Sequence, residues 1–106
     1  MLPPEVLNAS WTCELAWSTS VRERMFYAQA TGPEDATVEV ARSPKINWPP
    51  FLPPTPEGEV VAAARTIARA LVAAGWTPTT KGSSWYSQRF AWARDGSPPP
   101  LGIIGR

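Results

Sequence analysis

The sequence lacks histidine entirely and contains a single cysteine among its 106 residues. Histidine is the side chain most often used for general acid–base catalysis and for binding metal ions. Without a histidine, Cys13 has no obvious base to activate it as a nucleophile. A cysteine–histidine set of metal ligands is excluded for the same reason. We therefore expect a protein that is not an enzyme and that holds no metal and no cofactor.

Excess charge of either sign is also missing. Ten basic and nine acidic residues give a formal net charge of +1, and no long basic tract occurs. Proteins that bind duplex nucleic acid usually present a basic stripe, which this composition does not provide. The sequence also has no glycine-rich nucleotide-binding fingerprint. Nucleic acid is therefore a less favoured partner than protein.

Long apolar runs are absent as well. Residues 1–9 carry prolines and a glutamate where a signal peptide would have its apolar run, and the most apolar helical stretch contains Arg65 and Arg69. The single cysteine excludes an intramolecular disulfide and suits a reducing compartment. We expect a cytoplasmic protein without a membrane partner.

Tryptophan and proline, by contrast, are abundant, with six and thirteen residues. Most prolines fall in two clusters, at residues 43–56 and 97–100. Proline fixes φ and lacks an amide donor, so neither cluster is expected inside a helix or a central strand. The clusters divide the chain into a flexible segment at 1–9, a domain at 10–94 and a flexible proline-rich tail at 95–106. The apolar part of that tail could alternatively pair as an edge strand or act as a short linear motif.

Three stretches in the first half alternate between apolar and polar residues. In residues 10–19, Trp11, Cys13, Leu15 and Trp17 share one face, which is typical of a half-buried strand. Residues 24–31 and 36–42 predict two further strands, joined by a turn at 32–35. Short connections between these strands favour an antiparallel meander.

The stretch at 56–75 predicts a helix with one apolar stripe. Thr55 suits the cap, Pro56 the first helical position and Gly75 the end of the helix. A last strand is expected at 84–94. The order β-β-β-α-β predicts a single α+β domain, in which one amphipathic helix packs on one face of a mostly antiparallel sheet. Residues 43–56 form the crossover between sheet and helix. The stripe comprises Val60, Val61, Ala64, Ile67, Ala68, Leu71 and Val72.

Two sets of positions have a distinctive spacing. One set is Cys13-Glu14-Leu15 to Trp17 followed by Arg24 to Phe26-Tyr27-Ala28, and the other is Gly75-Trp76, Gly82, Trp85-Tyr86 and Arg89-Phe90. Together they resemble a family of small proteins from high-GC Gram-positive bacteria (actinobacteria) and their phages. The resemblance covers residues 11–92. It implies an actinobacterial setting and a small α+β fold, and it brings no activity with it.

The crossover offers the best candidate for a contact surface. Trp48, Phe51 and Leu52 lie between prolines in a stretch that cannot form regular structure. Either these side chains fold back as a lid on the core, or they are anchors for a partner, since tryptophan is a frequent hot-spot residue. We predict a small non-enzymatic interaction module that binds a protein partner or a second copy of itself. The partner-binding residues would be Trp48, Phe51, Tyr86, Arg89 and Trp92.

Two other interpretations remain open. Sheets that bind single-stranded nucleic acid combine stacking aromatics with nearby basic residues, and the chain offers Tyr27, Arg65, Arg69, Trp85 and Arg94 for this role. A catalytic carboxylate pair could come from Glu14, Glu23 or Glu39, and in a meander Glu14 and Glu39 could both point to the exposed face. For that pair, contact with water or with arginines is the simpler expectation.

Overall fold

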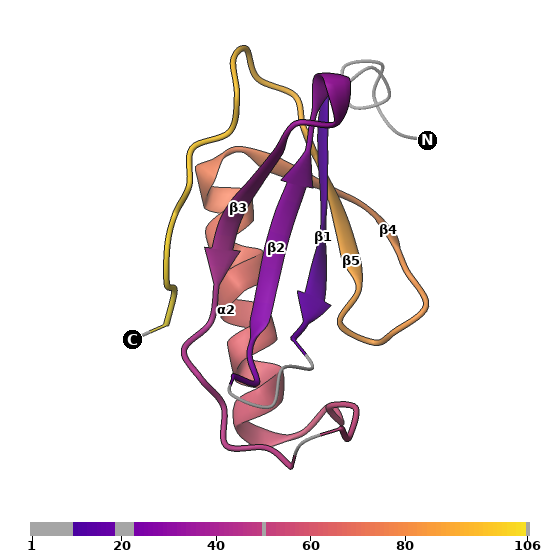
Figure 1. The fold of residues 1–106 in the computed structure, drawn as a ribbon, viewed down its shortest axis with the longest axis vertical. Helices are drawn as coiled ribbons and strands as arrows, with labels where there is room; N and C mark the ends of the chain where they lie inside the picture. Colours follow the sequence, from indigo (N-terminus) through magenta and orange to yellow (C-terminus); the bar gives the residue numbers. More distant parts are fainter. Residues whose placement is uncertain (1–9, 19–22, 50, 106) are drawn as a thin grey trace.

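A five-stranded antiparallel sheet and one helix make up the fold (Figure 1). The computed structural model describes residues 10–18, 23–49 and 51–105, so the segment expected to be flexible at 1–9 lies outside the described residues. The strand order across the sheet is β3-β2-β1-β5-β4, and every pair of neighbours is antiparallel. The elements are β1 (Trp11–Trp17), β2 (Phe26–Thr31), the short 3₁₀ helix η1 (Pro33–Asp35), β3 (Thr37–Arg42), α2 (Gly58–Ala74), β4 (Trp76–Lys81) and β5 (Gln88–Trp92).

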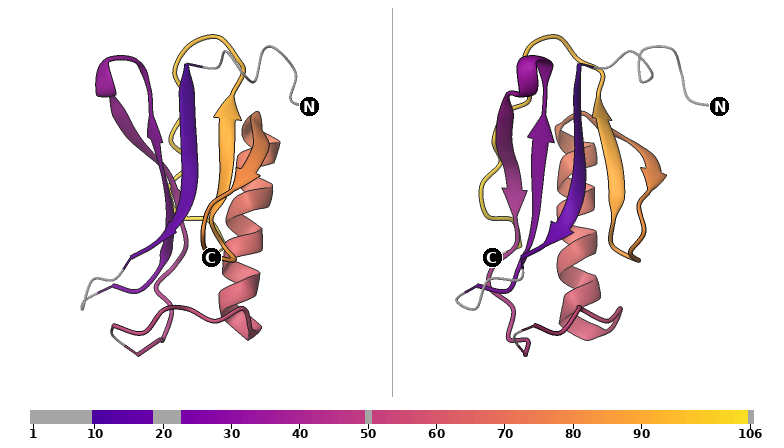
Figure 2. Two further views of the ribbon diagram at one scale, coloured as in Figure 1. Left: turned by 90° about the vertical axis from the view of Figure 1, so that its right-hand side faces the viewer. Right: turned by 45° about the vertical axis from the view of Figure 1, so that its right-hand side comes forward.

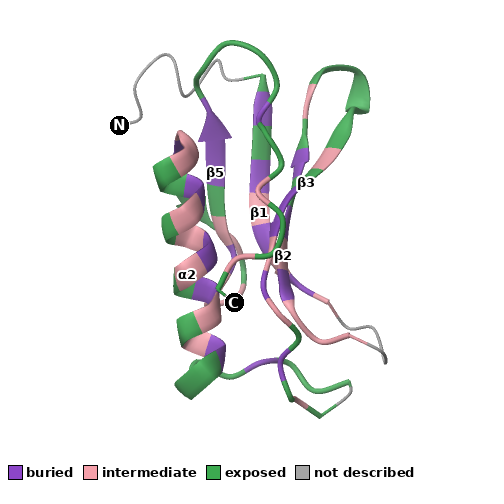
Figure 3. Ribbon diagram, turned by 90° about the vertical axis from the view of Figure 1, so that its left-hand side faces the viewer, coloured by how far each residue is buried: buried purple, intermediate pink, exposed green. Residues whose placement is uncertain are grey.

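The helix covers one face of the sheet, and no helix of the described residues covers the other (Figure 2). Val60, Ala64, Ile67 and Leu71 of α2 are buried, and Figure 3 shows the buried side of the helix turned toward the strands. Opposite them lie the apolar positions of each strand, because alternate side chains of a strand point to the same face. The predicted α+β class is therefore confirmed. Val72, the last residue of the predicted stripe, is 48% exposed instead.

The sheet has one strand more than the sequence indicated. β4 was missed because Pro78 lies within it, and proline argues against a strand. The exception is an edge strand, and β4 is at the edge of the sheet with a register shift after Pro78. The last strand is also shorter than predicted, since residues 84–87 form a turn that closes with a hydrogen bond from the Gly82 amide to the Ser87 carbonyl at 2.6 Å.

The two ends of the helix agree only in part with the prediction from the sequence. Gly75 ends α2 with a φ of 120° and its amide donates back to the carbonyls of Leu71 and Val72, as predicted. The helix begins at Gly58, two residues later than predicted. Thr55 does not cap it, because its hydroxyl donates to the Glu57 carboxylate at 2.7 Å.

The proline-rich tail lies against the domain. Residues 98–105 run alongside β3, where Arg42 and Ile103 form a parallel bridge (Figure 1). The interpretation as an edge-pairing segment therefore describes this tail better than the expectation of a free one.

Candidate protein-interaction site at the crossover loop

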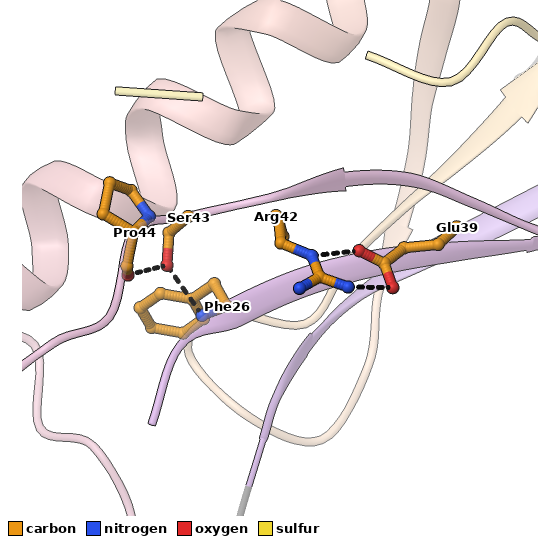
Figure 4. Close-up of polar contacts among 5 residues, drawn as sticks. All are labelled: Phe26, Glu39, Arg42, Ser43 and Pro44. Carbon is orange, nitrogen blue, oxygen red and sulfur yellow. Dashed lines mark hydrogen bonds and ion pairs between the residues drawn. The ribbon is translucent and has the colours of Figure 1, made fainter. Parts of the chain in front are cut away.

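Residues 43–56, here called the crossover loop, pass beneath the end of the sheet where β1 ends and β2 begins (Figure 1). Six of these fourteen residues are prolines, which explains why the loop has no regular structure. The loop is fastened at its start by Ser43, which is buried. The Ser43 hydroxyl accepts a hydrogen bond from the Phe26 amide at 3.0 Å and donates to the Pro44 carbonyl at 2.9 Å (Figure 4). The Ser43 amide also donates to the Phe26 carbonyl at 2.8 Å.

Two further hydrogen bonds hold the loop along its length. The Ile46 amide donates to the Arg24 carbonyl at 2.7 Å. Near the other end, the Trp85 indole donates to the Pro54 carbonyl at 2.8 Å, and Pro54 is buried. The described parts of the loop, residues 43–49 and 51–56, are thus hydrogen-bonded to the rest of the domain near both ends, and proline restricts φ wherever it occurs between these points.

The first half of the loop acts as a lid. Ile46 is buried in the core, and Trp48 is half-buried against it. The Trp48 indole N–H is buried and has no hydrogen-bond acceptor among the described residues. Packing of the ring, rather than a polar contact, therefore holds Trp48 in place. Of the two interpretations offered for this residue, the lid describes its position.

The second half of the loop points outward. Phe51 is 78% exposed and Leu52 is 54% exposed. Phe51 has a φ of 67°, a left-handed conformation that costs a residue with a Cβ roughly 1–2 kcal/mol. Strained backbone of this kind is concentrated at functional sites. The two residues, here called the exposed pair, are therefore large apolar side chains presented to solvent by a fixed loop.

The exposed pair borders a shallow hollow of about 200 Å³ that is also lined by Trp17, Tyr86, Pro53 and Pro54. Tyr86 is half-buried, and its ring lies 5.3 Å from that of Phe26 and 5.4 Å from that of Trp85. Trp85 in turn meets Phe26 edge-on at 5.9 Å. In the strand expected at 84–94, the neighbours Trp85 and Tyr86 would point to opposite faces, but in the observed turn both rings pack onto Phe26. Aromatic contacts thus run without a break from the core to the hollow.

Two of the five predicted partner-binding residues lie elsewhere. Trp92 is 5% exposed, packs on Trp76 with ring centroids 5.4 Å apart, and donates its indole hydrogen to the Gly96 carbonyl at 3.0 Å. Its assignment to a contact surface was wrong, because the apolar face of β5 is the core face. Trp92 pairs with Trp11, six residues before Trp17 on β1, which places it about 20 Å from the hollow.

Arg89 lies on the uncovered face of the sheet. Its guanidinium is 3.4 Å from the Glu14 carboxylate on the neighbouring strand, and both side chains are partly exposed. Phe51 and Tyr86 therefore meet at the hollow, Trp48 lies in the same loop as part of the lid, and Arg89 and Trp92 lie elsewhere. Leu52 and Trp17 join the site instead. Leu52 carries a signal in the sequence, since it follows Phe51 between two pairs of prolines, whereas Trp17 reads only as a core residue of its strand.

The residues considered for nucleic-acid binding do not form one surface. Tyr27 lies on the uncovered face of β2 and is half-buried, whereas Arg65 and Arg69 are exposed on α2, which covers the opposite face. Trp85 is part of the aromatic cluster at the crossover loop. The Arg94 side chain lies against Gly75, where an added Cβ would come within 2.5 Å of Nε. A stacking platform needs aromatics and cations on one side of the sheet, and here they are separated.

The uncovered face instead carries polar side chains in rows. Glu39, Gln29, Glu14 and Arg89 are successive register partners across four strands. The Cα atoms of Glu14 and Glu39 are thus separated by two strand spacings, about 10 Å. Each faces its own arginine, since the Arg42 guanidinium donates to both oxygens of Glu39, with Nη2 to Oε2 at 2.9 Å (Figure 4). An open trough of about 460 Å³ crosses this face, with Thr79 and Thr80 on one side. The two carboxylates do not converge on a common point.

Cys13 lies on the core face of β1 and is buried. Burial raises the pKa of its thiol to about 12, because the thiolate would lose its hydration. A thiol with this pKa is protonated at neutral pH and is a poor nucleophile. Within residues 10–18, 23–49 and 51–105, no three histidine, cysteine, aspartate or glutamate side chains are grouped so that they could hold a metal ion.

Comparison of the chain with protein-family models, with curated proteins and with solved structures found no match in any of the three. The resemblance to small actinobacterial proteins therefore stays a prediction. In the described part of the chain, no helix has both the length and the apolar character needed to cross a membrane.

Proposed function

We propose that this protein is a small non-enzymatic interaction module that binds another protein through the exposed pair, Phe51 and Leu52. The partner would offer an apolar pocket that receives the Phe51 ring, with Leu52 and the rim of Tyr86 closing around it. The observation that carries the proposal is the 78% exposure of Phe51 on a loop that is fixed at both ends.

The energetics of association support this choice. Burying large apolar side chains is the main favourable contribution at a protein interface, and hot spots are few and clustered. Ordering a flexible loop on binding usually opposes this gain. Here the prolines and the hydrogen bond from Trp85 to Pro54 hold the loop before a partner arrives, so that little further ordering is needed.

One ion pair lies at the start of the crossover loop, where Lys45 Nζ is 3.7 Å from a carboxylate oxygen of Glu23 and both side chains are partly exposed. An exposed ion pair of this kind contributes little free energy. The affinity for the partner would therefore come mainly from the exposed pair. The single reduced cysteine suits the cytoplasm, and we propose that the contact is made there, in an actinobacterium or in a cell infected by its phage.

The test replaces the exposed pair by Phe51→Ser with Leu52→Ser in an affinity-tagged chain expressed in its native cell. The protein that accompanies the wild-type chain is purified, and its affinity for both chains is measured. Removal of hot-spot side chains that contribute about 2 kcal/mol or more predicts at least a thirtyfold weaker complex. Thermal melting checks that the fold is unchanged.

Val72→Ser is the matched control, because Val72 is also an exposed aliphatic residue but lies on α2. We expect this variant to bind the partner with wild-type affinity. A complex that survives the loss of the exposed pair, or that is weakened equally by Val72→Ser, would contradict the proposal.

A nucleic-acid role is the alternative, and the separation of Tyr27 from Arg65 and Arg69 argues against it. Binding to single-stranded oligonucleotides that weakens steeply with salt would support this alternative.

A further inference from the structure

The two edges of the sheet differ in how they are protected. β4 forms one edge and is interrupted by Pro78 and a register shift. β3 forms the other edge, and residues 98–105, here called the tail segment, lie along it. An uncovered edge strand is a template for pairing with another chain, and natural proteins interrupt or cover such edges. On this molecule, the cover of β3 is a segment from the far end of the chain.

Three backbone hydrogen bonds attach the tail segment to β3 in parallel orientation. The Leu101 amide donates to the Val40 carbonyl at 2.7 Å, and the Arg42 amide donates to the Gly102 carbonyl at 3.0 Å. The Ile104 amide then donates to the Arg42 carbonyl at 2.8 Å. These bonds fix the register of the segment, in the manner of a peptide that adds a strand to an exposed sheet edge.

The side chains of the segment supply the specificity. Leu101 and Ile104 are half-buried against the core, whereas Ile103 between them points outward and is 39% exposed. Ile104 borders a hollow of about 280 Å³ between the start of the crossover loop and α2. A Cβ on Gly105 would lie 3.4 Å from the Thr66 side chain of α2, so the segment passes close to the helix. The edge of β3 and the flank of α2 thus form a groove for a Leu-x-x-Ile sequence.

The connection that brings the segment to this groove is exposed to solvent. Residues 93–97 are all exposed, and the chain crosses the end of the sheet from β5 to β3 (Figure 1). The hydrogen bond from the Trp92 indole fastens this connection at Gly96, which has a φ of 77°. Three prolines, Pro98 to Pro100, follow. Consecutive prolines favour a stiff, extended conformation, which keeps a released segment projecting from the domain.

We propose that the β3 groove is a strand-docking site and that its occupant in trans is the tail segment of a second copy of this chain. Every copy carries a segment that fits the groove in the register observed here. A segment that leaves its own groove therefore forms the same hydrogen bonds and apolar packing in the groove of the other copy, and only the connection at 93–97 changes conformation. The resulting dimer would exchange segments reciprocally. It uses a surface separate from the exposed pair, and so does not depend on the function proposed above.

The test measures mass by light scattering over a range of concentrations for the full chain and its variants. The measured mass of the wild-type protein is expected to rise with concentration, from the mass of the monomer toward twice that mass. Leu101→Asp with Ile104→Asp should remain monomeric, since it places two charges in the groove. The matched control is Ile103→Asp, which puts the same charge on the outward-facing residue and should form dimers like the wild type. Phe51→Ser with Leu52→Ser should also form dimers.

The result that overturns the proposal is a wild-type chain that stays monomeric at every concentration. A dimer that persists in Leu101→Asp with Ile104→Asp, or one that is lost in Phe51→Ser with Leu52→Ser, would overturn it too, because association would then use another surface.

A second measurement does not depend on these variants being folded. Hydrogen exchange of the Leu101 and Ile104 amides is compared with that of amides in β1 and β2 of the wild-type chain. A segment that leaves its groove while the sheet stays intact exchanges at least tenfold faster. Equal rates would mean that the segment is released only on global unfolding, which contradicts exchange between folded copies.

Discussion

The crossover loop and the tail segment are both rich in proline, yet they are attached to the domain in different ways. The crossover loop buries side chains, with Ile46 and Trp48 packed on the core and Pro54 held by Trp85. The tail segment adds three backbone hydrogen bonds to β3 to the packing of buried Pro98 and of half-buried Leu101 and Ile104. Proline cannot donate such bonds, so in the tail they fall on the residues after the three prolines. A proline-rich segment is therefore positioned by side-chain packing, by hydrogen bonds that its carbonyl groups accept and by those that its residues other than proline donate.

The largest difference between the two segments should appear in stability. Trp48→Ala removes a half-buried ring from the lid and should lower the free energy of unfolding by about 2–4 kcal/mol. Urea denaturation followed by circular dichroism measures this change. Trp48→Phe is the control, because it keeps a smaller aromatic ring in the lid and gives up an N–H that has no acceptor among the described residues, so the loss of stability should be clearly smaller than in Trp48→Ala.

Shortening two side chains of the tail segment should lower the free energy of unfolding by a smaller amount. Leu101→Ala with Ile104→Ala removes two half-buried side chains at the edge and should lower the free energy of unfolding by about 1–2 kcal/mol. Ile103→Ala, whose side chain points outward, should change it by less than about 0.5 kcal/mol. If the double variant is less stable than Trp48→Ala, the contrast between a side-chain lid and a backbone-held strand is wrong.

The smallest effect, and one of opposite sign, is expected at Phe51. Phe51 has the left-handed backbone conformation, which asparagine tolerates better than phenylalanine does. Phe51→Asn should therefore raise the free energy of unfolding by about 0.5–1 kcal/mol. The same substitution should weaken partner binding, because it removes the Phe51 ring. Leu52→Asn, at a position without a positive φ, should leave stability within about 0.5 kcal/mol of the wild type. A loss of stability in Phe51→Asn would show that the ring contributes to the fold.

Much of the fold follows from periodicity in the sequence. The alternation of Trp11, Cys13, Leu15 and Trp17 gave the first strand and its core face, and Gly75 gave the end of the helix. β4 did not follow, because Pro78 is compatible with a strand only at an edge, and which strand forms the edge is a tertiary property.

The candidate site could be predicted only in part for a similar reason. Trp48 and Phe51 have the same kind of neighbours in the sequence, namely prolines and other apolar residues. Their different exposure depends on two hydrogen bonds that position the loop. One joins the Ile46 amide to the Arg24 carbonyl, and the other joins the Pro54 carbonyl to the Trp85 indole, 31 residues away in the chain. Trp92 was mispredicted for a related reason. The sequence does not show which face of the last strand the helix covers, so it could not tell that Trp92 lies in the core.

The most direct measurement is photo-crosslinking from the exposed pair in the native cell. A benzoyl-phenylalanine residue is placed at position 51, and at position 72 of α2 as the exposed reference. The account predicts one discrete protein adduct from position 51 that is absent at position 72 and that disappears when unlabelled wild-type chain is added in excess. No adduct at position 51, or the same adduct from both positions, would contradict the claim that Phe51 and Leu52 form the contact surface of this protein.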